Sequence, residues 1–110
     1  MQVIINSDNQ IDVHESFVEH WRAGIAGSLK RFDGWVTRVE VHLTDENSNS
    51  RGGGDDIRCL LEARPADRQP VSVEVRDESP EKALAEGIQT LGRRLGTMLD
   101  KTRTQKRKPL

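Results

Sequence analysis

The chain has 110 residues and a formal net charge of −1, with 17 Lys and Arg against 18 Asp and Glu. A chain of this length forms one domain that buries roughly 65% of the surface of its unfolded state, and it has no apolar run long enough for a transmembrane helix. The start Met-Gln-Val-Ile-Ile also lacks the basic region and the length of a signal peptide. We therefore expect a cytoplasmic protein with no membrane partner.

The charges are distributed unevenly along the chain. Residues 1–92 hold 10 basic against 17 acidic side chains, whereas residues 93–110 hold seven basic side chains and one acidic side chain. A basic segment on an acidic body costs self-repulsion unless a polyanion neutralises it, so it indicates an electrostatic binding surface. A solvated tail that only keeps the protein soluble would explain the same charge, and charge alone does not choose between the two.

The first third of the chain predicts a strand and a helix. Gln2 to Asn6 is a short, partly β-branched run that ends in a polar turn. Asp12 and Glu15 have the spacing of a capping box, which marks a helix start. Apolar residues at spacings of three and four then predict a helix of about five turns that ends at Asp33-Gly34. This stripe comprises Val18, Trp21, Ile25, Leu29 and Phe32.

From Trp35 the apolar period changes from helical to two. The alternate positions from Thr37 to Leu43 predict a strand whose buried face begins at Thr37. After a polar loop the alternation returns in segments 57–63 and 71–75. The connections are too short for parallel crossovers, so these three strands should form an antiparallel meander.

The last predicted element is a second helix. Ser79 is placed to cap it, and Pro80 occupies the first turn, where proline is tolerated. An apolar stripe runs from Leu84 to Leu99. The three glycines inside the helix cost about 1 kcal/mol each relative to alanine, so a close approach to the sheet, to the other helix or to an RNA backbone should compensate. They are Gly87, Gly92 and Gly96.

The element order is therefore β-α-β-β-β-α. It predicts an α+β fold in which two helices pack on one face of a four-stranded sheet. We expect this single domain to cover residues 1–101. Residues 102–110 lack apolar periodicity and should form a basic, disordered tail.

Residue types for catalysis or metal binding are sparse. His14, His20 and His42 match no metal-ligand spacing, and the Gly-rich segment 51–54 lacks the lysine and the strand-to-helix context of a phosphate-binding loop. Cys59 lies in an alternating apolar segment, which indicates a buried residue rather than a nucleophile. We therefore expect no enzyme activity, no cofactor, no metal ion and no small-molecule substrate.

Basic residues on the helices favour a binding function instead. At about 100° per residue, Arg94 and Lys101 lie in one narrow sector beside the apolar stripe of the second helix, with Arg93 on the far side. On the first helix Arg22, Lys30 and Arg31 point in different directions. If the two helices lie side by side, their exposed faces could present a basic patch to RNA phosphates.

Several segments resemble the ribosome hibernation-promoting and ribosome-associated inhibitor family. They are the opening Met-Gln-Val-Ile-Ile-Asn, the segment from Phe17 to Phe32 leading into Val39-Glu-Val-His-Leu, and the closing helix from Ala83 to Lys101, taken together with the element order. The resemblance implies a fold similar to a double-stranded-RNA-binding domain. It also implies binding in the decoding region of the small ribosomal subunit, where the protein inhibits translation in stationary or stressed cells by occluding the messenger and transfer RNA sites.

The same resemblance implies which residues contact ribosomal RNA. Basic residues on both helices take this role in the family, and here they are Arg22, Lys30, Arg93, Arg94, Lys101 and Arg103. The chain ends at Leu110 and so resembles the short form of the family, which lacks the second domain that dimerises ribosomes. Whether it silences single ribosomes or promotes their pairing stays open. It departs from the family in having few lysines and in the acidic pairs Asp45-Glu46 and Asp55-Asp56.

A non-enzymatic protein-interaction module is the alternative function. It would use the acidic strands and loops, with a homo-oligomer joined through the sheet face opposite the helices. Substituting Glu40, Glu62 or Glu74 would then abolish binding, whereas substituting Arg94 and Lys101 would leave it intact.

Overall fold

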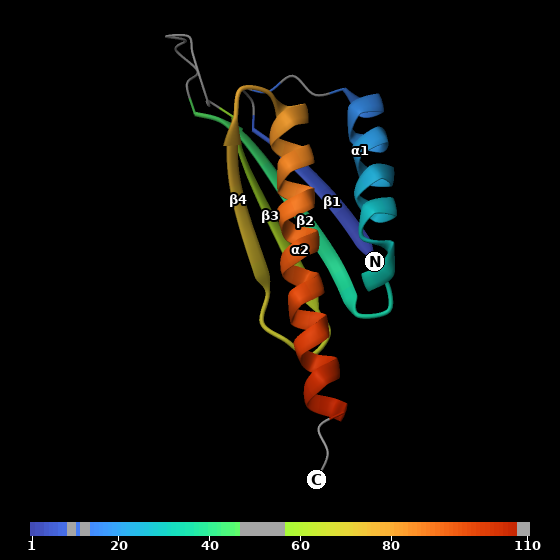
Figure 1. Cartoon of the computed structure of the whole chain (residues 1–110). Helices are drawn as coiled ribbons and strands as arrows, with labels where there is room; N and C mark the ends of the chain where they lie inside the picture. Colours follow the sequence, from blue (N-terminus) through green and yellow to red (C-terminus); the bar gives the residue numbers. More distant parts are fainter. Residues whose placement is uncertain (9–10, 12–13, 47–56, 108–110) are drawn as a thin grey trace.

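The computed structural model describes residues 1–8, 11, 14–46 and 57–107, and it describes side chains as far as Lys101. The elements are β1 (Gln2–Ser7), α1 (Glu15–Ser28), a 3-10 turn η1 (Lys30–Phe32), β2 (Val36–Asp45), β3 (Ile57–Pro65), β4 (Val71–Asp77) and α2 (Pro80–Arg107). The four strands form one sheet, and both α-helices lie on the same face of it (Figure 1). The predicted α+β architecture is confirmed.

The strands follow the order β1-β2-β3-β4 across the sheet, so β1 and β4 are its edges. β1 pairs parallel to β2, because α1 carries the chain back along the sheet between them. The β2–β3 and β3–β4 pairs are antiparallel, which confirms the predicted meander. Residues two apart along each strand share a face, so one row faces the helices and consists of Ile5, Val41, Leu61 and Val73.

One expectation about β2 is wrong. The register of β2 against β3 shifts between Val36 and Arg38. A bulge of this kind changes which residues face the core. Val36 is therefore buried, whereas Thr37, which we expected on the buried face, is exposed and donates from Oγ1 to the Arg64 carbonyl at 3.0 Å. From Val39 onward the buried face is as predicted.

The core lies between the helices and the sheet and is mainly aliphatic. No polar or charged side chain among the described residues is buried. Cys59 is buried there as expected, and loss of hydration raises the pKa of its thiol from the ordinary value of 9.0 to about 12. The fully buried side chains include Ile25, Leu29, Phe32, Val39, Val41, Leu61, Leu84, Leu91 and Leu95.

The helix starts agree only in part with the sequence patterns. α1 begins at Glu15 with His14 as its N-cap, and no side chain caps it by a hydrogen bond; the expected cap Asp12 lies outside the described residues, as does the Gly-rich segment 51–54. The Lys82 amide donates to Ser79 Oγ at 3.2 Å, which confirms the predicted cap of α2.

The helix ends differ from expectation. α1 ends at Ser28, and the apolar stripe continues through η1, where Phe32 is buried. α2 continues through Arg107, six residues beyond the predicted end at Lys101. No glycine or proline interrupts residues 102–107, and their basic residues complement the partial negative charge of a helix C-terminus. The rest of the expected tail, residues 108–110, lies outside the described residues.

Close packing explains two of the three α2 glycines. A Cβ at Gly87 would overlap Leu61 Cδ1 on the sheet, and one at Gly96 would overlap the guanidinium of Arg31. A Cβ at Gly92 would meet only Leu29 Cδ2, at an ordinary distance of 3.7 Å. The backbone of α2 therefore lies directly over β3 at Gly87, while Gly92 has room for a methyl group beside Leu29.

Alanine substitutions should separate these two positions. Gly92→Ala should raise the free energy of unfolding by up to about 1 kcal/mol, because alanine favours the helix and meets no clash. Gly87→Ala should lower it by about 1 kcal/mol, since overpacking against the fully buried Leu61 costs more than the helix gains. Urea unfolding monitored by circular dichroism measures both changes; equal stabilisation by the two variants would contradict the close approach of α2 to β3.

Candidate nucleic-acid interface

Arg93 lies on the crest of α2, the side that faces away from the core. Its side chain is exposed, and Nη2 donates to Thr90 Oγ1 at 3.3 Å. Glu86 and Asp100 lie seven residues before and after it, so they share the crest. Arg93 therefore lies between two carboxylates on the crest, which is not made basic by this one residue.

Arg94 lies on the flank of α2 that faces β4. Its side chain is exposed, and Nη1 donates to the Ser72 carbonyl on β4 at 2.8 Å. Lys101, seven residues further, shares this flank because seven residues make almost two turns. Lys101 is exposed, and the C-terminal end of α2 extends past the sheet (Figure 1). The backbone of Arg103 is helical, and its side chain lies outside the description.

The two predicted cations of the first helix have different environments. Arg22 is held against β1, because Nε donates to the Val3 carbonyl at 3.3 Å, and Nη1 is 2.5 Å from Glu19 Oε1. It lies about 120° around α1 from Ser28, which faces α2. Lys30 is exposed on η1. The charge of Arg22 is therefore balanced within the protein by Glu19, whereas Lys30 faces solvent.

Arg31 is a residue that sequence reasoning did not assign to the interface. The carbon of its guanidinium lies 4.5 Å from the centroid of the Phe32 ring, a cation–π contact. The same guanidinium lies against Gly96, where any side chain would overlap it. Two signals were present in the sequence, since Arg31 is one of the cations near the end of the first helix and Gly96 predicted a close approach without identifying its partner.

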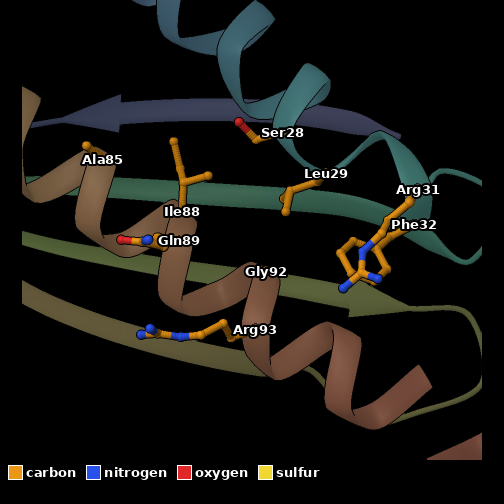
Figure 2. Close-up of a pocket in the computed structure, with 9 residues that line it drawn as sticks. All are labelled: Ser28, Leu29, Arg31, Phe32, Ala85, Ile88, Gln89, Gly92 and Arg93. Atoms are coloured by element: carbon orange, nitrogen blue, oxygen red, sulfur yellow. The ribbon is translucent and has the colours of Figure 1, made fainter. Parts of the chain in front are cut away.

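A groove of about 410 Å³ separates α2 from α1 and η1, and Arg31 and Arg93 are among its lining residues (Figure 2). Small residues on both sides, namely Ser28, Ala85 and Gly92, leave the space between the helices unfilled. A second hollow, of about 330 Å³, lies on the β4 flank and is lined by Val71, Arg93, Arg94, Thr97 and Met98. Arg93 borders both.

The sheet face opposite the helices, called here the open face, is not acidic in net terms. Glu40 lies 3.3 Å from Arg38 Nε, and Glu62 accepts from Arg64 Nη2 at 3.0 Å. Glu74 pairs with Arg58. Pairs at this exposure contribute about 0 to 1 kcal/mol each to stability, so their main effect is to neutralise the face. The alternative function needs an acidic surface, but arginines on the open face neutralise its glutamates.

The structure therefore does not gather the predicted residues into one patch. It places Arg93 between the groove and the β4 flank, Arg94 and Lys101 on that flank, and Arg22 on the far side of α1. Among the described residues, no group of three or more His, Cys, Asp and Glu side chains could hold a metal ion. Neither helix in the described part combines the length and the hydropathy that membrane crossing requires.

Comparison with known proteins shows where this fold occurs. No family model and no curated protein matches the chain. Among solved structures, the N-terminal domain of Thermus thermophilus protein Y matches with a TM-score of 0.67 and 14% identity, covering 89% of this chain and 99% of that chain. A ribosomal subunit interface protein from Coxiella burnetii matches with a TM-score of 0.65 and 8% identity, covering 91% and 99%.

The chain shares its fold with these two proteins. At 14% and 8% identity the likeness concerns the fold, and it extends over nearly all of this chain. It confirms the resemblance that the element order and the helix segments suggested.

Alanine substitutions should distinguish the structural part played by Arg94 from that of Lys101. Arg94→Ala removes the hydrogen bond to the Ser72 carbonyl and should lower the free energy of unfolding by about 0.5 to 1.5 kcal/mol. Lys101→Ala changes an exposed residue near the end of the helix and should leave stability within about 0.5 kcal/mol. Thermal unfolding of both variants measures this; an unchanged melting temperature for Arg94→Ala would mean that the bond contributes nothing in solution.

Proposed function

We propose that this protein is a ribosome-binding inhibitor of translation in the cytoplasm that acts without catalysis. It binds the small ribosomal subunit through ribosomal RNA and occludes the sites of messenger and transfer RNA, in stationary or stressed cells. The observation that carries the proposal is the shared fold, because one of the similar structures is described as a ribosomal subunit interface protein. The exposed cations of η1 and α2 would neutralise phosphates of the ribosomal RNA.

The six basic residues named from the sequence remain the proposed RNA contacts, and the structure supports them unequally. Lys30, Arg93 and Lys101 are exposed, and among the described residues none of the three has an ion pair that a phosphate would have to break. Arg22 and Arg94 already donate to backbone carbonyls, so they would contribute charge more than new hydrogen bonds. Arg31 joins the set because its guanidinium is exposed beside the groove.

The helix side is favoured over the open face on electrostatic grounds. On the open face, arginines are paired with glutamates, so binding a phosphate there would break an existing pair. On the helix side the chain becomes basic from Arg93 onward. Phosphate neutralisation with release of counterions is favourable where cations are not already neutralised.

The salt dependence of binding tests the proposal. Each cation that neutralises a phosphate contributes roughly 0.7 to 0.9 to the slope of log affinity against log salt concentration. The double variant Arg93→Ala, Lys101→Ala should therefore bind small ribosomal subunits more weakly at every salt concentration, with a slope reduced by about 1.5. Co-sedimentation through sucrose gradients at several salt concentrations measures both quantities.

The matched control removes two cations from the open face. Arg64→Ala with Arg76→Ala changes the net charge equally, on residues that are 44% and 50% exposed. This control should keep the wild-type slope. If the wild-type protein fails to co-sediment at low salt, the ribosome proposal is wrong; if the two double variants lose affinity equally, the helix side is not the contact.

A further inference from the structure

The groove between the helices has an apolar lining, which phosphate binding does not require. Its lining includes the apolar side chains of Leu29, Phe32 and Ile88, all of which belong to the core. Its volume of about 410 Å³ lies within the range of small-ligand sites, about 300 to 1,000 Å³. RNA phosphates that bind only to the cations would leave this apolar depression unfilled.

We propose that this groove receives a single unpaired nucleobase of the RNA that the helices bind. The proposal rests on the proposed function and names the RNA feature that the site reads. Proteins recognise structured RNA largely through unpaired bases, which stack on aromatic rings or on arginine planes and form hydrogen bonds through their edges. Among its lining residues the groove offers an arginine plane, Arg31, and a side-chain amide, Gln89.

Arg31 provides the stacking surface at one end of the groove, and the buried Phe32 ring supports its guanidinium from the core side. Figure 2 shows both side chains together at one end, with Leu29 and Ile88 along the gap between the helices. The cation–π contact with Phe32 orients the Arg31 guanidinium before any ligand arrives, at a place where Gly96 leaves room for it. A restrained planar cation loses less freedom when a base stacks on it than an unrestrained one does.

Gln89 and the nearby cations provide the polar contacts. The amide of Gln89 is exposed at the groove and carries both donors and an acceptor, as a base edge requires. Lys30 and Arg93 are exposed on the two elements that form the walls. A nucleotide matches this combination, because its base is planar and uncharged while its phosphate is anionic.

Filling the groove tests the proposal, and Gly92 offers a direct way. An added side chain there meets only Leu29 Cδ2, at 3.7 Å from Cβ, so Gly92→Leu should project into the groove without disturbing α2. Gly27→Leu is the matched control, because a Cβ at the exposed Gly27 on α1 would find nothing within 4 Å. Thermal unfolding should show both variants folded.

The first readout is affinity for small ribosomal subunits at one salt concentration. Losing one stacked base should weaken binding by Gly92→Leu about 5- to 150-fold, whereas Gly27→Leu should bind like the wild type. The second readout is chemical probing of the subunit RNA with dimethyl sulfate and a carbodiimide, which together modify the pairing edges of unpaired bases. At least one base should be protected by the wild type and by Gly27→Leu but not by Gly92→Leu.

The outcomes separate this inference from the proposed function. If Gly92→Leu binds with wild-type affinity and the same protections, the groove holds no base, although ribosome binding stands. If its affinity falls while every base protection persists, the groove contacts RNA backbone or ribosomal protein, and the inference is again wrong. If the wild-type protein does not bind subunits at all, both proposals fail together.

Discussion

The close approach of α2 to the sheet is the constraint on which the rest of the structure depends. Gly87 has no side chain, so the helix backbone lies against Leu61 of β3, and the fully buried Leu84 and Leu91 continue the contact on the same face of the helix. This contact sets the height and direction of α2. It allows Arg94 to reach the Ser72 carbonyl of β4, and it brings Gly96 beside Arg31. The positions of the groove and of the α2 cations follow from it.

Two arginines named as RNA contacts also protect the edges of the sheet. Edge strands expose backbone groups that can pair with another chain, and charged side chains are a common protection. Arg22 donates to a carbonyl of β1 and Arg94 to one of β4, so each edge of this sheet holds one guanidinium. A long side chain can cover an edge while its charge stays in water. Edge protection and attraction of an anionic partner are therefore compatible at these residues.

The features that the sequence predicted are those that a local period determines. Alternation identified the three meander strands, and the three-and-four spacing identified both helices. The bulge in β2 was not predicted because Val36 and Thr37 both suit a strand, so the pattern does not show which of them faces the core. The contacts of Arg31 were not predicted because the chain changes from an α-helix to a 3-10 turn after Ser28. This change alters the rotation per residue and so the direction of the side chain. The groove was not predicted because it depends on small residues of two helices that are far apart in sequence.

Tethered radical cleavage tests most directly whether the helix side, and not the open face, contacts ribosomal RNA. Cys59 is buried with a raised thiol pKa, so an iron chelate can be attached selectively to a new cysteine. Two exposed sites serve for comparison, with Glu86→Cys on α2 and Ser72→Cys on the open face. We expect cleavage of small-subunit RNA from the Glu86→Cys protein and little from the Ser72→Cys protein. Stronger cleavage from the Ser72→Cys protein, or cleavage from neither, would contradict this expectation.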